Sequence, residues 1–447
     1  NQGNQLPDDQ PYNTAPWNYT GNETLPDPLP EEVVDWLLVE LRSTTENVFI
    51  RKAVLLNEDG SILTDFEEYE VELAVYDLYY IALHHRNHLP VMSAVPIGIP
   101  ITGNQYDFTD IDNVYQGGAV PLEPGRSSHV GMIAGNTVVD DKLAYSGPGN
   151  DRGPILSKIY AEGDQPVYIN STLEDGYWPE DVNMNNVISY LGNPNDRSPI
   201  LANILAMTGS TLLTTIYHSV VPGTYGRSQQ GTPGDGPVHI QLTETPAGAE
   251  LRLTTTQAIT DGVIDNLQFS LAWQSDDVEI AQLLQDYSSS FMLQAQGEPV
   301  SLGGGISYQT FAMAMPLQLP ASWTEEQLIV LEFTSEAYAN IQQRLWLAND
   351  DYTASHNAMY YISIWGTDHT GQIMGTAVSV DEQLTDYSIR LYPNPVNQGR
   401  LNLAFSGIET QELVMHIMDA KGKQVMAESF EASAQQMKAI NIQHLQP

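Results

Sequence analysis

A fifteen-residue segment of this chain occurs twice, and the second copy follows the first at an offset of 45 residues. Residues 145–159 read YSGPGNDRGPILSKI and residues 190–204 read YLGNPNDRSPILANI, so that nine of the fifteen positions are identical. Chance does not produce such agreement in a chain of 447 residues. The repeat indicates a built, duplicated module in the middle of the chain.

Each copy predicts a loop that is followed by a helix. Pro154 and Pro199 come directly after an Asn-Asp-Arg-x run, and proline suits the first helical turn, whose N–H groups have no partner. The apolar residues that follow recur at helical spacing and predict one buried face per helix: Ile155, Leu156 and Ile159 in the first copy, Ile200, Leu201 and Ile204 in the second. We expect the two helices to pack together.

Short oxygen-bearing side chains stand before the second copy. Residues 181–185 read DVNMN, which puts an Asp or Asn at every second position. Loops that bind Ca²⁺ surround the ion with hard oxygen ligands in this way. The repeat therefore predicts a metal-stabilised module rather than a catalytic one.

The charge of the chain excludes some classes of partner. The sequence has 56 acidic residues against 17 Lys and Arg, a formal net charge of −39. Such a charge repels nucleic acid and anionic membrane surfaces and attracts divalent cations. The chain has no cysteine, so disulfides do not stabilise it, and bound Ca²⁺ could replace them. No segment approaches the roughly 20 apolar residues that a membrane-spanning helix needs.

The pattern along the chain predicts a mainly β, multidomain protein. Residues 1–30 are rich in proline and predict an extended N-terminal arm, either loose or docked on a neighbouring subunit. Residues 31–125 and 237–377 contain short strands separated by turns, which is typical of β-sandwiches. Residues 126–225 hold the repeat, and residues 388–447 form a small all-β terminal module.

The terminal module resembles the C-terminal sorting domain of type IX secretion substrates. The resemblance lies in LYPNP at 391–395, the following Gly399, DAKGKQV at 419–425 and INIQHL at 440–445. It implies an extracellular or cell-surface protein that is recognised by the type IX secretion machinery. The family pattern continues beyond these segments, so we expect the domain to be truncated at Pro447.

The repeat resembles the dockerin-like, EF-hand-like calcium module of exported surface proteins. This resemblance implies side-chain ligands at Asp181, Asn183 and Asn185, a backbone oxygen at Val187 and a closing carboxylate at Asp196. The closing residue follows Asp181 by 15 positions, against about 11 in the standard loop. The loop is therefore longer than the family pattern.

The first copy carries the same resemblance less completely. Asn136, Asp140, the backbone of Lys142 and Asp151 are the implied ligands, but the intervening Val138 has no side-chain oxygen. The alternative for both loops is a turn held only by Asx hydrogen bonds. We expect the arginine after each closing aspartate to hold the loops by pairing with carbonyls or carboxylates.

Two weaker resemblances concern the sandwiches. Residues 80–94, YIALHHRNHLPVMSA, look like part of a domain of long surface proteins of the same secretion route. Residues 237–377 look cohesin-like. Together the resemblances imply Ig-like or cohesin-like sandwiches in series with the calcium module.

Motifs of catalysis do not appear in the sequence. His84 and His88 would share one face of a single strand, and His85 the other, which falls short of the three or four ligands of a zinc site. We expect hydrogen-bonded strand histidines there. The chain has no His-Glu-x-x-His and no Gly-x-Ser-x-Gly run. We therefore predict that the protein is not an enzyme.

These features favour a calcium-stabilised structural subunit of an extracellular appendage, filament or adhesive fibre. Its expected partners are further copies of itself or other surface proteins. A surface adhesin that binds a glycan or a protein is the first alternative, and a secreted hydrolase is the second.

Overall fold

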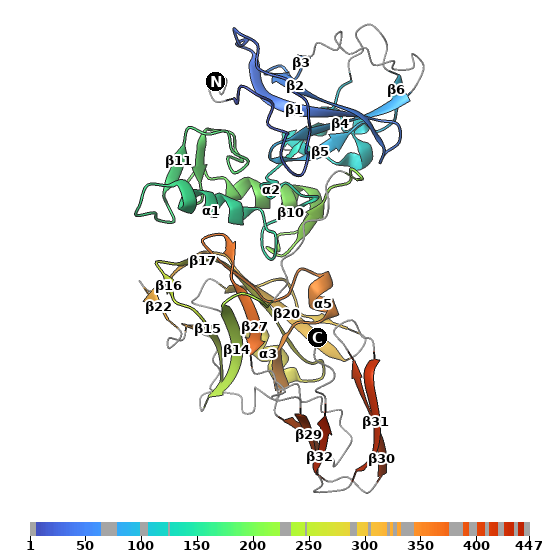
Figure 1. Cartoon of the computed structure of the whole chain (residues 1–447), viewed down its shortest axis with the longest axis vertical. Coiled ribbons are helices and arrows are strands. Elements are labelled where there is room, and N and C mark those ends of the chain that lie inside the picture. The colour runs from blue at the N-terminus through green and yellow to red at the C-terminus, as the bar shows by residue number, and fades with distance from the viewer. Residues whose placement is uncertain are drawn as a thin grey trace. The chain divides into compact units, whose positions relative to one another are not determined.

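The chain forms two compact units, residues 1–374 and residues 375–447. The computed structural model in Figure 1 describes residues 6–63, 78–98, 106–123, 126–223, 234–245, 248–286, 293–302, 305–319, 322–324, 329–331, 344–374, 388–392, 400–406, 411–418, 424–432 and 437–441. Strands predominate over helices in these residues, as the sequence predicts.

The described part of the first unit begins with a seven-stranded sheet of order β3-β2-β1-β4-β5-β9, in which β6 pairs with β4. Its strands are β1 (Val33–Arg42), β2 (Val48–Asn57), β3 (Ile62–Leu63), β4 (Leu78–His85), β5 (His88–Met92), β6 (Ile97–Gly98) and β9 (Ile133–Ala134). The short helices η2 (Ile111–Asn113) and η3 (Tyr115–Gly117) and the hairpin β7 (Val120–Glu123) and β8 (Arg126–Gly131) come before β9 in the chain.

Strand β1 lies at the centre of this sheet and is buried on both faces. Because successive side chains of a strand point to opposite faces, Trp36 and Leu38 join one hydrophobic cluster and Leu37 and Val39 join another. A strand covered on both sides reads as a nearly continuous apolar run, which is how 33–41 reads in the sequence.

The N-terminal segment covers one face of this sheet. The side chains of Tyr12 and Trp17 are buried and pack edge to face at 5.0 Å. The Tyr12 hydroxyl donates to the carbonyl of Trp36 at 2.8 Å, and the Trp36 indole donates to the carbonyl of Pro7 at 3.2 Å. The segment is irregular, as its prolines predict, but its aromatic residues are buried within the same chain instead of projecting toward a neighbour.

The repeat folds into two loop–helix units. The elements are β10 (Lys142–Ala144), α1 (Arg152–Glu162), β11 (Thr172–Glu174), β12 (Val187–Ser189), α2 (Arg197–Thr208) and β13 (Ile216–His218). Both predicted helices are confirmed, and both begin at the arginine of the repeated motif. The fully buried Ile159 and Ile204 belong to one hydrophobic core, so the two helices share it.

The last part of the first unit holds a four-stranded sheet of order β23-β15-β14-β27 and an eight-stranded sheet along β18-β20-β17-β25-β26, counted over the described residues. Apolar residues of both sheets, such as Ile240 and Leu253 of one and Phe269 and Phe311 of the other, share one core. The elements are β14 (Val238–Thr245), β15 (Gly248–Thr255), β16 (Ile259–Thr260), β17 (Val263–Gln274), α3 (Val278–Asp286), β18 (Leu293–Ala295), β19 (Val300–Ser301), β20 (Ile306–Met313), β21 (Leu317–Gln318), β22 (Ser322–Trp323), β23 (Ile329–Leu331), β24 (Leu345–Ala348), α5 (Asp351–Ser355), β25 (Tyr361–Ile364), β26 (Thr367–Asp368) and β27 (Thr370–Met374).

The second unit is all β in its described residues. Strands β28 (Ser388–Tyr392), β29 (Arg400–Ser406) and β32 (Met437–Asn441) form one antiparallel sheet, and β30 (Gln411–Met418) pairs with β31 (Gln424–Ala432). Leu391 and Tyr392, the first two residues of the LYPNP motif, end β28. Residues 393–395 of that motif and the Asp-x-x-Gly turn lie outside the described residues.

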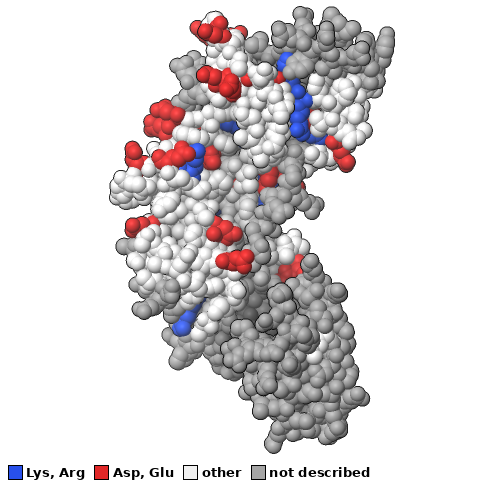
Figure 2. Space-filling model, viewed as in Figure 1, with Lys and Arg blue, Asp and Glu red and all other residues white. Residues whose placement is uncertain are grey.

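The surface carries the acidic charge that the sequence predicts. On the face shown in Figure 2, acidic side chains are spread over the described surface and outnumber the basic ones. No helix in the described part of the chain is long and apolar enough to cross a bilayer.

Candidate functional site

The asparagine of the repeated Asn-Asp-Arg triplet caps each helix. The side-chain oxygen of Asn150 accepts the N–H of Gly153 at 3.0 Å, and that of Asn195 accepts the N–H of Ser198 at 3.0 Å. Each amide also donates to the carbonyl of a preceding glycine with positive φ, at 2.8 Å and 2.7 Å. A capping side chain satisfies one of the free N–H groups of the first helical turn.

The aspartate of the triplet turns away from the helix and closes the loop before it. The two oxygens of Asp151 accept the N–H groups of Val138 at 3.2 Å and Ala144 at 2.8 Å. The equivalent Asp196 accepts those of Asn183 at 3.1 Å and Ser189 at 2.7 Å. Neither aspartate makes a side-chain cap to its own helix, because the preceding asparagine already does so.

The arginine of the triplet stacks on a tyrosine of its own copy. The guanidinium carbon of Arg152 lies 4.7 Å from the ring centre of Tyr145, and that of Arg197 lies 5.1 Å from the ring centre of Tyr190. Cation–π contacts are thus the described contacts of both guanidinium groups. This explains why both copies begin with tyrosine. Burial lowers the pKa of Arg152, but the nearby tyrosines and the buried carboxylate of Asp265 raise it.

The second loop brings the predicted ligands Asp181, Asn183, Asn185, Val187 and Asp196 into one hydrogen-bonded turn. The Asp181 carboxylate accepts the N–H groups of Asn185 at 3.0 Å and Asn186 at 2.9 Å, and the Asn185 side chain accepts that of Val187 at 2.9 Å. Both polar atoms of the Asn183 amide are buried without a hydrogen-bond partner among the described residues. Such an oxygen is available to a cation.

The first loop follows the same pattern with different chemistry. The Asn136 side chain accepts the N–H of Asp140 at 3.0 Å, and the Asp140 carboxylate accepts that of Lys142 at 3.0 Å. Val138 stands where the second loop has Asn183. The ammonium of Lys142 donates to the carbonyl of Pro148 at 3.1 Å.

Each loop buries two carboxylates near one another. Burial is the main factor that raises the pKa of Asp196 to about 6, and the nearby Asp181 raises it further against the backbone hydrogen bonds that lower it. Burial and Asp140 likewise raise the pKa of Asp151 well above its usual range, while Lys142 opposes them. The first loop therefore contains its own positive charge, and the second does not.

The residues of the second loop fit a hard divalent cation. Its oxygens belong to carboxylates, amides and a backbone carbonyl, the donor set that Ca²⁺ prefers. Among the described residues, no three Asp, Glu or His side chains converge as a metal-binding group. A cation in this loop would consequently depend on amide and carbonyl oxygens besides Asp181 and Asp196.

The histidines that the sequence placed on one strand lie on two. The turn at 86–87 joins β4 to β5, so that His85 and His88 face each other across a hairpin. His85 lies 3.0 Å from the carboxylate of Asp35, and His84 lies 3.2 Å from that of Glu40. His84 and His85 thus contact buried acids of β1, which the sequence did not predict because both acids lie inside an apolar run.

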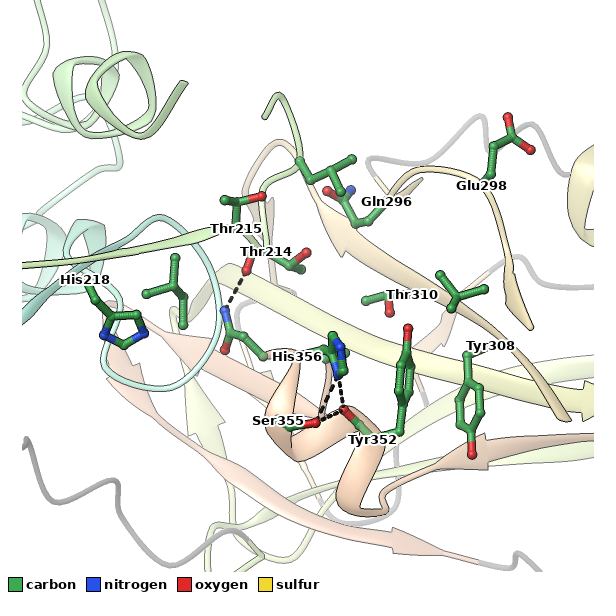
Figure 3. A pocket seen from close by; sticks show the side chains of 15 residues that line it. Thr214, Thr215, His218, Gln296, Glu298, Tyr308, Thr310, Tyr352, Ser355 and His356 are labelled. Carbon is green, nitrogen blue, oxygen red and sulfur yellow. Dashed lines mark hydrogen bonds between the residues drawn. The ribbon is translucent and has the colours of Figure 1, made fainter. Parts of the chain in front are cut away.

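A pocket of about 400 Å³ lies beside the repeat module. Figure 3 shows its lining, which comes from the segment between α2 and β13, from β20 and the segment before it, and from α5. Tyr352 lies between Tyr308 and His356, with ring centres 4.4 Å and 4.3 Å away. Polar side chains such as Thr214 and Glu298 line the remainder. Sequence reasoning gave no signal for this site, because its residues come from distant segments.

The comparison with known families identifies the second unit. Residues 390–447 match the family described as the secretion system C-terminal sorting domain. No curated protein sequence matches the chain. A sorting domain of this family directs export and implies an interaction with the secretion machinery. The protein is a type IX secretion substrate that is exported to the cell surface or the extracellular space.

Proposed function

We propose that this exported protein is a calcium-stabilised structural component of the cell exterior and that its second repeat loop holds the ion. Asp181, Asn183, Asn185 and Asp196 would supply side-chain oxygens and Val187 a backbone oxygen. The bound ion would neutralise two buried carboxylates and so stabilise the folded module. The proposal includes the dockerin-like character of the repeat and the Ig-like or cohesin-like character of the sheets, and it assigns no catalytic activity.

One observation carries the calcium proposal. The second loop buries Asp181 and Asp196 close enough for the Asp181 charge to raise the pKa of Asp196, beside the amide of Asn183, which has no hydrogen-bond partner among the described residues. Burying like charges is unfavourable unless a counter-charge is present. A divalent cation supplies that counter-charge with the ligand chemistry that the loop offers.

The first loop supports the same argument by contrast. It has the equivalent backbone hydrogen bonds, but the positive charge of Lys142 opposes the rise in the pKa of Asp151 that burial and Asp140 cause, and Val138 replaces an amide ligand. We propose that Asn136, Asp140, the backbone of Lys142 and Asp151 bind Ca²⁺ much more weakly than the second loop does.

Thermal unfolding of the full chain with Ca²⁺ and with a chelator tests the proposal. We expect the chelator to lower the melting temperature and to expose residues 130–205 to protease, because a ligand that binds only the folded state stabilises it. Asp181→Ala should melt at one temperature in both conditions. The exposed Asp164 provides a control, and Asp164→Ala should respond as the wild type does. Equal melting of the wild type in both conditions would remove calcium from the account.

The structural role concerns assembly into an appendage, filament or adhesive fibre. The support is the type IX sorting domain together with the sheets that predominate in the described residues. Docking by the N-terminal segment is not part of this proposal, since Tyr12 and Trp17 pack on the chain's own sheet. Negative-stain micrographs of the purified protein in Ca²⁺ should show ordered oligomers, and discrete monomers under all conditions would contradict the structural role.

The pocket favours a second candidate function, binding of a glycan or a surface protein. Its volume of about 400 Å³ and its mixture of tyrosine, histidine and hydroxyl side chains are suited to a small polar ligand. A glycan array with the wild type and with Tyr352→Ala tests it. Binding that the substitution removes would support this candidate, and an array without binding would count against the glycan.

A further inference from the structure

The side chain and carbonyl of Asn87 contact both repeat loops at once. Its carbonyl oxygen accepts the N–H groups of Gly135 and Asn136, each at 2.9 Å, where the first loop begins. Its side-chain amide donates to the carbonyls of Pro179 at 3.1 Å and Asp181 at 2.8 Å, where the second loop begins. Asn87 is fully buried, although it belongs to a hairpin turn. Turn residues of a sheet are usually exposed, so burial of this turn indicates a specific role.

A chain of hydrogen bonds fixes the orientation of the Asn87 amide. The carbonyls of Pro179 and Asp181 only accept, so the NH₂ group of Asn87 faces them and its side-chain oxygen faces Nδ1 of His88 at 2.8 Å. That oxygen is an acceptor, so His88 donates its Nδ1–H toward it and toward Nδ1 of His85, which lies 2.7 Å away. With Nδ1 as an acceptor, His85 carries its proton on Nε2, which lies 3.0 Å from the Asp35 carboxylate.

A second contact from the same turn holds the segment that enters the second loop. Arg86 pairs with Asp35 and donates to the carbonyl of Trp178 at 3.3 Å. Its guanidinium carbon lies 4.2 Å from the ring centre of Tyr177, whose hydroxyl donates to Asp35 at 2.7 Å. The residues that precede Asp181 are thus bound to the N-terminal sheet at several points.

Tight packing holds the first loop in the same place. Gly135 has a φ of +115°, and a Cβ at this position would lie 2.9 Å from the side chain of Ile200 in α2. A side chain at position 135 would therefore push this part of the loop and Ile200 apart. The turn, both loops and the second helix form one continuous set of contacts.

We infer that Asn87 is a positioning residue for the second loop, which it holds through the carbonyl of Asp181, and that the β4–β5 turn links the N-terminal sheet to both repeat loops. The inference rests on the proposed function, because a positioned second loop serves Ca²⁺ binding. The run HHRNH then has a physical explanation, because His85 and His88 belong to the hydrogen-bond network of Asn87, and Asn87 and Arg86 contact the segment that enters the second loop. Partners that orient metal ligands typically change metal affinity by about 10–100-fold when they are removed.

The test uses the full chain and Asn87→Asp, which keeps the acceptor for His88 but removes both donors to the second loop. Asn357→Asp is a matched control, because Asn357 is also buried and its amide also donates to two carbonyls, those of Ser146 and Thr214. We expect Asn87→Asp to weaken Ca²⁺ binding about tenfold or more, and Asn357→Asp to leave it unchanged. If Asn87→Asp does not fold, Asn87→Ser provides the same test without adding a charge. The serine side chain is too short to reach the carbonyls of Pro179 and Asp181, so both hydrogen bonds are lost.

Hydrogen exchange of the metal-free variants gives a second readout. The amides of Asn185 and Asn186, which bond to the Asp181 carboxylate, should exchange faster in Asn87→Asp than in Asn357→Asp. Wild-type affinity together with wild-type exchange in Asn87→Asp would overturn the inference and leave the calcium proposal intact. Fast exchange in Asn87→Asp, together with a wild type that binds no Ca²⁺, would uphold the positioning role of Asn87 and overturn the calcium proposal.

Discussion

Asp151 and Asp196, which are 45 residues apart, make the same two backbone hydrogen bonds in two different loops. Each closes its own loop and stands immediately before a helix that the preceding asparagine caps. Each residue of the repeated motif therefore has a separate role. The tyrosine ring stacks with the arginine, the asparagine caps the helix, and the aspartate closes the loop.

Removal of the closing carboxylate should destabilise the module even without metal. Asp196→Ala leaves the N–H groups of Asn183 and Ser189 without their acceptor, and each loss costs about 1–3 kcal/mol when the group is buried. We expect urea denaturation to show a loss of about 2–4 kcal/mol in the free energy of unfolding. The exposed Asp164→Ala should change it by less than about 0.5 kcal/mol. Equal stabilities of the two variants would refute this role.

The capping asparagine should have a smaller and separable effect. Asn195→Ala removes the acceptor for the N–H of Ser198, and loss of such a cap costs about 1 kcal/mol. Asn195→Ser retains a capping oxygen and should recover most of that loss. The same denaturation experiment measures both, and identical losses in the two variants would show that the cap is unimportant.

The ring of Tyr190, and not its hydroxyl, should stabilise the second copy. The hydroxyl is buried with no hydrogen-bond partner among the described residues, whereas the guanidinium of Arg197 stacks on the ring. Tyr190→Phe should therefore leave stability unchanged or raise it slightly. Tyr190→Leu should lower it by about 1–2 kcal/mol through the lost cation–π contact. A large loss in Tyr190→Phe would mean that the hydroxyl has a partner.

Stability of the metal-free protein should depend on Asp196 in acid. Burial raises the pKa of Asp196 to about 6 in the folded chain, so between about pH 4 and pH 6 the folded state holds this proton more tightly than the unfolded state does. The stability that the proton contributes is present at low pH and is lost as the pH rises through about 6. The melting temperature of the wild type relative to Asp196→Asn should fall over this window and then level off. Ca²⁺ should reverse the trend, because it favours the ionised carboxylate.

The sequence predicted what depends on local pattern. The repeated Pro and Ile positions predicted both helices, and the motifs around Tyr392 and Gly399 predicted the sorting domain. The triplet was recognised as important, but the separate roles of Asn150 and Asp151 depend on which way each side chain turns at the helix start. The direction of each side chain depends on which backbone N–H groups the folded loop brings close to it. The sequence pattern alone does not show these positions.

Long-range contacts explain what the sequence did not reveal. Asp35 lies inside a run that reads as apolar, yet it is buried against Arg86 and Tyr177. The histidines were placed on one strand because the turn at 86–87 has neither glycine nor proline. The N-terminal segment was expected to be loose or docked on a neighbouring subunit, because its aromatic residues pack against β1 and no local periodicity encodes that packing.

Calorimetric titration of the full chain with Ca²⁺ tests the central claim most directly, with substitutions at the equivalent positions 181 and 136 of the two loops. The wild type should show one tight site, which Asp181→Ala abolishes and Asn136→Ala retains. Absence of binding heat in the wild type, or an unchanged titration in Asp181→Ala, would contradict the account.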